Sequence, residues 1–122
     1  MGLAANQARL NVLTARKSDL EYRLILISNQ TQRLTAEKSS EINEKAKALN
    51  TYMEGNDQKV SFTETVAFMN YEKAMNELEA AQNRLDVQQK SLETELKAVS
   101  SEQEEVSKLV ESNTKKSFAY FN

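Results

Sequence analysis

The sequence predicts an all-α protein, a long antiparallel hairpin of two coiled-coil-like helices that assembles into an oligomer or filament. Three observations lead to this prediction. An apolar residue recurs every seven positions through much of the second half of the chain. The 122 residues include two glycines and no proline, too few for the turns of a β-sheet protein of this size. One cluster of turn-forming residues divides the chain near its middle.

The first helix is expected over residues 3 to 54. Its apolar residues follow one another at steps of three, four or seven, which places them on one side of a helix. The step from Leu34 to Ile42 is eight, through Lys38, and predicts a stutter at which the supercoil relaxes. The residues of this helix expected to face the second helix are Leu13, Leu20, Leu24, Ile27 and Leu34.

The turn is expected over residues 55 to 60. Gly55 can adopt a positive φ and end the first helix, and Asn56 and Asp57 are turn formers. Ser61 and Glu64 match a capping box, which would begin the second helix. Because a helix end and a helix start so close together place two helices side by side, residues 1 to 122 are expected to form one hairpin domain.

The second helix is expected over residues 61 to 119. Its seven-residue repeat runs from Tyr71 to Val106, while its other faces carry mainly Glu, Gln, Lys, Asn and Ser. A seam this narrow needs another helix packed against it. The residues of the second helix expected to face the first are Leu78, Leu85, Leu92, Leu96, Val99 and Val106.

The distribution of charge supports the antiparallel arrangement independently. A hairpin with its turn near residue 57 brings a basic group at the start of the first helix beside an acidic group at the end of the second. The basic group is Arg9, Arg16 and Lys17, and the acidic group is Glu95, Glu102, Glu104 and Glu105. Exposed ion pairs contribute little stability, but they favour one register and orientation over others.

Three groups of apolar residues have two interpretations each. Ile25 and Leu26 either thicken the core or form a second interface between subunits. The aromatic tail, which contains Phe118, Tyr120 and Phe121, either folds back on the first helix or docks on another copy of the chain. A third group, of aromatic and apolar residues beside the turn, either closes the hairpin tip or binds a partner. The candidate self-association residues are Ile25, Leu26, Phe118, Tyr120 and Phe121.

Two residue types that commonly carry chemistry, cysteine and histidine, are missing from the chain. The chain has no Cys and no His, which excludes disulfides, thiolate metal sites and the commonest general base. The paired carboxylates are typical of solvated helix faces, so no catalytic, cofactor-binding or metal-binding residue is expected, and the protein is not expected to be an enzyme. A net charge of -2 does not indicate a nucleic-acid partner.

No apolar run is long enough to span a membrane, and no cleavable signal is expected.

The composition and the hairpin pattern together resemble those of exported bacterial filament subunits, namely flagellins and the needle and filament proteins of type III secretion. The opening from Gly2 to Leu10 and the stretch from Leu13 to Tyr22 are also similar to the start of small helical proteins of gut bacteria that have no known activity. The first resemblance implies an antiparallel coiled coil whose copies stack into a tube.

The expected function is therefore that of a non-enzymatic structural protein, a self-assembling subunit of an exported filament or appendage. Its partners would be further copies of itself and an export chaperone, and its location extracellular or at the cell surface by a route without a cleavable signal. The alternative is a cytosolic adaptor or export chaperone that acts as a dimeric four-helix bundle.

Overall fold

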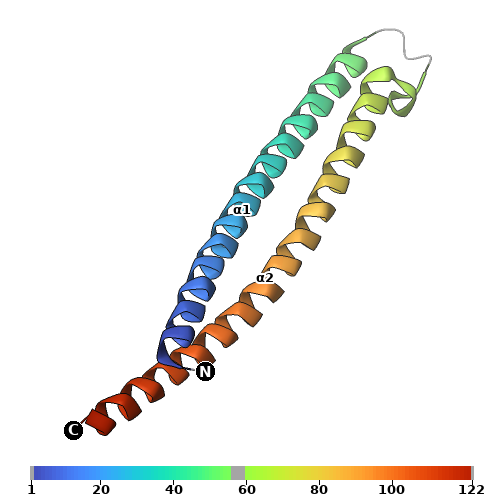
Figure 1. The fold of residues 1–122 in the computed structure, drawn as a ribbon. Coiled ribbons are helices and arrows are strands. Elements are labelled where there is room, and N and C mark those ends of the chain that lie inside the picture. Colours follow the sequence, from blue (N-terminus) through green and yellow to red (C-terminus); the bar gives the residue numbers. More distant parts are fainter. Residues whose placement is uncertain (1, 56–59, 122) are drawn as a thin grey trace. The chain divides into compact units, whose positions relative to one another are not determined.

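The computed structural model of the chain describes residues 2–55 and 60–121, with side chains described as far as residue 119. It contains helix α1 (Leu3–Glu54), a short 3-10 turn η1 (Phe62–Glu64) and helix α2 (Val66–Phe121). The two long helices pack against each other, and no strand occurs among the described residues, which confirms the all-α hairpin (Figure 1). The expected turn formers Asn56 and Asp57 lie outside the described residues.

The start of α2 differs from the expected capping box. Ser61 makes no side-chain capping hydrogen bond, and its Oγ lies 3.0 Å from Oγ1 of Thr63. Thr65 has the extended backbone of an N-cap residue instead, and its Oγ1 accepts a hydrogen bond from the Phe68 amide at 3.3 Å. The 3-10 turn that contains Glu64 comes between the predicted and the observed cap, so α2 begins five residues later than expected.

The end of α1 also differs from expectation. Gly55 follows the last helical residue, but no glycine among the described residues has a positive φ. The Gly55 amide donates instead to the carbonyl oxygens of Thr51 and Tyr52, at 3.2 and 3.3 Å. These two bonds continue the helical pattern by one residue and satisfy carbonyl groups that a helix end otherwise leaves unpaired.

The chain divides into two compact units. The terminal unit consists of Met1–Leu26 with Gln88–Asn122, and the loop unit consists of Ile27–Val87. In the terminal unit, four buried side chains from the two helices form the core, and four partly buried ones pack around them. The core residues are Leu13, Leu20, Val99 and Val106, and the surrounding ones are Leu10, Leu92, Leu96 and Val110.

In the loop unit, aromatic side chains pack in sequence beside the turn. The ring of Phe62 lies 5.6 Å from Tyr52 and 5.6 Å from Phe68, and Phe68 lies 6.0 Å from Tyr71, measured between ring centroids. The Tyr52 hydroxyl donates to the Val60 carbonyl at 2.5 Å. The aromatic residues therefore join the end of α1 to the start of α2, as the closed-tip interpretation of this cluster requires.

The predicted stutter in α1 is wrong. Partly buried positions continue at alternating steps of three and four through Lys38, Glu41 and Lys45, whereas Ile42 is 47% exposed. The Lys38 ammonium donates to Oε1 of Gln82 on α2, and the Lys45 ammonium lies 4.6 Å from the centre of the Tyr71 ring. The aliphatic stems of these long side chains cover the seam while their polar ends reach a partner, so the heptad continues through polar residues.

Candidate self-association surface

Every residue that the sequence places on the intramolecular seam is buried or partly buried. Five of them have exposed fractions of at most 6%. The buried residues are Leu13, Leu20, Ile27, Val99 and Val106, and the partly buried ones are Leu24, Leu34, Leu78, Leu85, Leu92 and Leu96. All of them occur at heptad-related positions, so the apolar repeat identifies the face that each helix turns toward the other within its unit.

Ion pairs flank this seam in the terminal unit. Arg9 pairs with Glu102, and the Arg16 guanidinium lies 3.6 Å from the Glu95 carboxylate. All four residues belong to the basic and acidic groups that the antiparallel arrangement is expected to bring together, and the structure determines which of them pair. All four side chains are between 40% and 58% exposed, so each pair contributes less than about 1 kcal/mol and mainly favours this register.

One polar residue on the seam was not recognised from the sequence. Asn6 is 3% exposed, and no described residue forms a hydrogen bond with its Oδ1. It occupies the position seven residues before Leu13, where the heptad would otherwise place an apolar side chain. A buried amide at such a position lowers stability and disfavours other registers.

The predicted self-association residues lie on the surface where their side chains are described. Ile25 is 58% exposed, Leu26 is 42% exposed and Phe118 is 71% exposed. Helix α2 continues through the aromatic tail to Phe121, so the tail backbone is helical. The side chains of Tyr120 and Phe121 lie outside the described residues. Ile25 and Leu26 therefore do not thicken the core between the two helices.

Ile25 and Leu26 belong to a larger surface on the side of α1 that faces away from the seam. We call it the outer α1 face. All its residues are exposed, and Asp19 is the one charged residue among them. The outer α1 face consists of Ala4, Ala5, Ala8, Asn11, Val12, Ala15, Ser18, Asp19, Tyr22, Ile25 and Leu26.

The corresponding side of α2 in the same unit provides an internal comparison. It is equally exposed, but seven of its twelve residues are charged. These residues are Lys90, Ser91, Thr94, Lys97, Ala98, Ser101, Glu104, Glu105, Lys108, Glu111, Ser112 and Lys115. A solvated helix face carries many charges, as this side of α2 does, so the nearly uncharged side of α1 is the exception.

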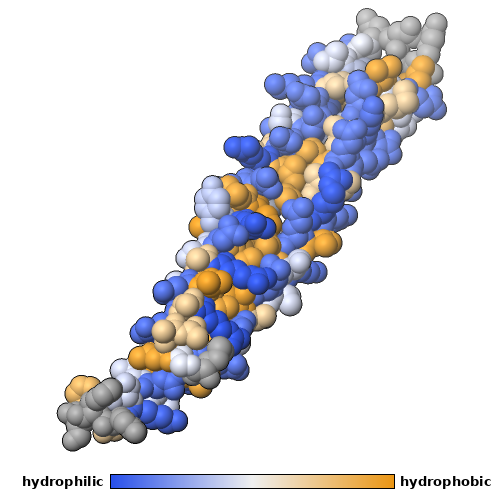
Figure 2. Space-filling model, viewed as in Figure 1, coloured by the Kyte–Doolittle hydropathy of each residue, from blue (hydrophilic) through white to orange (hydrophobic). Residues whose placement is uncertain are grey.

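Large apolar side chains contribute to the surface of the described residues. Hydrophobic residues remain visible among hydrophilic ones in the space-filling view (Figure 2). On the outer α1 face, Val12 and Tyr22 are 67% and 59% exposed, in addition to Ile25 and Leu26. Apolar side chains this close together on one helix face mark an interaction surface more often than scattered ones do.

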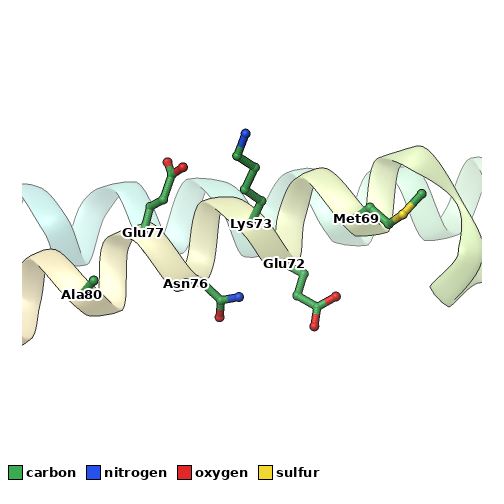
Figure 3. A pocket seen from close by; sticks show the side chains of 6 residues that line it. All are labelled: Met69, Glu72, Lys73, Asn76, Glu77 and Ala80. Carbon is green, nitrogen blue, oxygen red and sulfur yellow. The ribbon is translucent and has the colours of Figure 1, made fainter.

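The surface hollows of the described residues are shallow. One lies along α2 in the loop unit, lined by residues between Met69 and Ala80. Its Lys73 and Glu77 side chains point to one side of the helix and Glu72 and Asn76 to the other, so they converge on no common point (Figure 3). No group of three or more acidic residues among the described ones is arranged to hold a metal ion.

A second hollow lies between α1 and α2 in the terminal unit. Thr14 and Gln103 face each other across it, and the Gln103 Nε2 donates to the Thr14 Oγ1 at 3.0 Å. Ser100 and Ser107 line the same groove. Its lining consists mainly of small hydroxyl and long polar side chains, which is the composition of a solvated edge of the seam.

Neither helix in the described part of the chain is long and apolar enough to cross a bilayer.

Comparison with known proteins finds no matching protein-family model, no matching curated protein and no matching solved structure. The outer α1 face is thus identified by its own exposure and composition alone.

Proposed function

We propose that this chain is a non-enzymatic structural protein whose copies assemble through the outer α1 face, as the helical subunit of an exported filament or appendage. The observation that carries the proposal is this exposed side of α1, which has one charged residue and several large apolar ones. Each additional Å² of apolar surface that assembly removes from water contributes roughly 25 cal/mol, so a second helix against this face is favourable.

The size of the core supports the same proposal. Among the described residues, five apolar side chains are buried, from Leu13 to Val106 along the chain. Two helices enclose little volume between them, and a chain of this length gains more burial by packing against neighbours. Assembly would add apolar contacts on α1 that the hairpin by itself leaves in water.

The exported setting rests on the resemblance of the composition and the hairpin pattern to those of flagellins and type III secretion subunits. In such an assembly the partners are further copies of this chain, with an export chaperone before assembly. The location would be extracellular or at the cell surface.

The alternative, a cytosolic adaptor or export chaperone acting as a dimeric four-helix bundle, is favoured by one specific observation. Of the two outer helix faces compared in the terminal unit, the one on α1 alone is nearly uncharged. A single self-complementary patch closes an assembly at two copies, whereas a filament needs a second, different contact.

Sedimentation velocity over a wide range of protein concentrations, followed by negative-stain electron microscopy, tests the proposal. We expect the sedimentation coefficient to rise with concentration and elongated polymers to be visible in the micrographs. A species that stops at the dimer would favour the adaptor. A chain that remains a monomer at every concentration would contradict both functions.

A further inference from the structure

The outer α1 face contains a second heptad-spaced row. Its members alternate at steps of three and four, the same spacing that the intramolecular seam uses on the opposite side of the helix. A helix with this spacing on two sides is suited to pack against two helices. In the hairpin, α2 covers the first side, and every member of the second row is exposed. The row consists of Ala5, Ala8, Val12, Ala15, Asp19, Tyr22 and Leu26.

The two ends of the row differ in side-chain size. Its N-terminal part carries the small side chains of Ala5 and Ala8, and its C-terminal part carries the large ones of Tyr22 and Leu26. Ala15 stands at the midpoint. If a second copy of the row runs in the opposite direction about Ala15, its two largest side chains meet alanines, because Leu26 faces Ala5 and Tyr22 faces Ala8. The remaining pair places Val12 against Asp19, whose carboxylate is already paired with Arg23. Facing large and small side chains interdigitate without voids.

We propose that two copies of this chain pair through this row, with their α1 helices antiparallel about a two-fold axis at Ala15. The inference rests on the proposed function only in requiring that copies associate, and it names the contact that joins them. The contact is isologous, so the same residues serve both copies. It applies whether the assembly stops at two copies or continues through another surface.

The charges along the row fit a second copy. A partner for this row must itself be nearly uncharged over the same length, and among the helix faces of the terminal unit the row itself meets that condition. The arginines on its flank already have carboxylate partners within the chain: Arg23 pairs with Asp19 at 3.0 Å, and Arg16 lies 3.6 Å from Glu95. Pairing two copies therefore brings together no uncompensated row of like charges.

A parallel arrangement of the same two helices packs less well. It places Tyr22 against Tyr22 and Leu26 against Leu26 at one end, and Ala5 against Ala5 at the other. The large residues then hold the helices apart where the small ones need close approach. Gaps of this kind lose the contacts on which helix packing depends.

Distances between spin labels on the two copies test the orientation. The chain has no Cys, so Ala4→Cys and Ser18→Cys each provide a single labelling site beside the row. At 1.5 Å per residue, the antiparallel pairing separates the two Ala4 sites by about 33 Å along the helix axis and the two Ser18 sites by about 9 Å. Any parallel pairing gives the two sites the same separation. The distances between the spin labels are measured by pulsed electron-electron double resonance. Equal distances for the two variants would overturn the proposal.

A substitution at Ala15, on the proposed two-fold axis, tests where the two copies contact each other. Ala15→Glu places two like charges opposite each other in the pair, and we expect the dimer dissociation constant to rise at least about tenfold. Ser101→Glu is the matched control, because Ser101 is equally exposed on the outer side of α2 in the same unit. Circular dichroism should show the same helix content for both variants.

These outcomes separate the inference from the proposed function. If the chain associates but Ala15→Glu weakens association no more than Ser101→Glu, the two-fold contact is wrong while self-assembly stands. If the wild-type chain does not associate, both fail. Association of the row only with a different protein, with no change in the mass of the isolated chain, would also overturn the proposal.

Discussion

Two leucines on the same helix and in the same unit separate folding from assembly. Leu20 is 3% exposed in the core of the terminal unit, whereas Leu26 is 42% exposed on the outer α1 face. Leu20→Ala removes packed side-chain atoms and leaves a cavity, which typically costs 2–5 kcal/mol. Because a two-helix core can partly close or admit water, we expect the lower part of that range, about 2–3 kcal/mol.

The control variant Leu26→Ala should behave differently. At a concentration where the chain is monomeric, Leu26 has few contacts to lose, and alanine is at least as good a helix former. We expect a change of about 0.5 kcal/mol or less in the free energy of unfolding. The assay is urea unfolding followed by circular dichroism at 222 nm, with both variants and wild type at the same low concentration. Equal losses for Leu20→Ala and Leu26→Ala would refute the assignment of the seam.

Three further predictions concern single features of the structure. Asn6→Leu removes a buried amide oxygen without a hydrogen-bond partner and should stabilise the chain by about 1–2 kcal/mol in the same urea assay; a loss of stability would mean that the amide is satisfied in solution. Thr65→Ala should lower the free energy of unfolding by about 1 kcal/mol and Ser61→Ala should hardly change it, since Thr65 is the N-cap residue of α2. The reverse order would mean that Ser61 caps the helix, as the sequence pattern predicts. Deleting residues 118–122 should reduce association in sedimentation experiments without lowering helix content; a large loss of helix would assign the tail to the hairpin's own fold.

The sequence predicts the helices and their contacting faces well because the apolar repeat is nearly continuous. Leu20 and Val106 belong to this repeat, and they are the most deeply buried apolar residues among those that the structure describes. The prediction is wrong where the seam becomes polar. Lys38 and Lys45 give no apolar signal in the sequence, although their stems pack on the seam and their ends reach Gln82 and Tyr71.

The candidate surface is harder to predict than the seam. Ile25 and Leu26 are conspicuous in the sequence because they stand next to other large apolar residues. Of the other nine residues of the outer α1 face, four are alanine, which is common in any helix and gives no strong hydropathy signal. What distinguishes the face is its lack of charge beside a highly charged α2, and that comparison requires knowledge of which residues are exposed together.

The beginning of α2 illustrates a different limit. Ser61 and Thr65 are both acceptable cap residues by type, and the sequence pattern favours Ser61 because Glu64 follows at the right spacing. Packing determines which of the two residues caps the helix, since the 3-10 turn before Thr65 places the ring of Phe62 between Tyr52 and Phe68. Tertiary contacts of this kind are not encoded in the local spacing of cap residues.

The central claim, that copies of this chain associate through the outer α1 face, is tested most directly by sedimentation equilibrium of wild type and of the double variant Ile25→Ser with Leu26→Ser. We expect the average mass of the wild-type chain to rise with concentration, while the double variant remains a monomer with the same helix content by circular dichroism. A wild-type chain that stays monomeric at high concentration, or a double variant that associates as strongly as wild type, would contradict the claim.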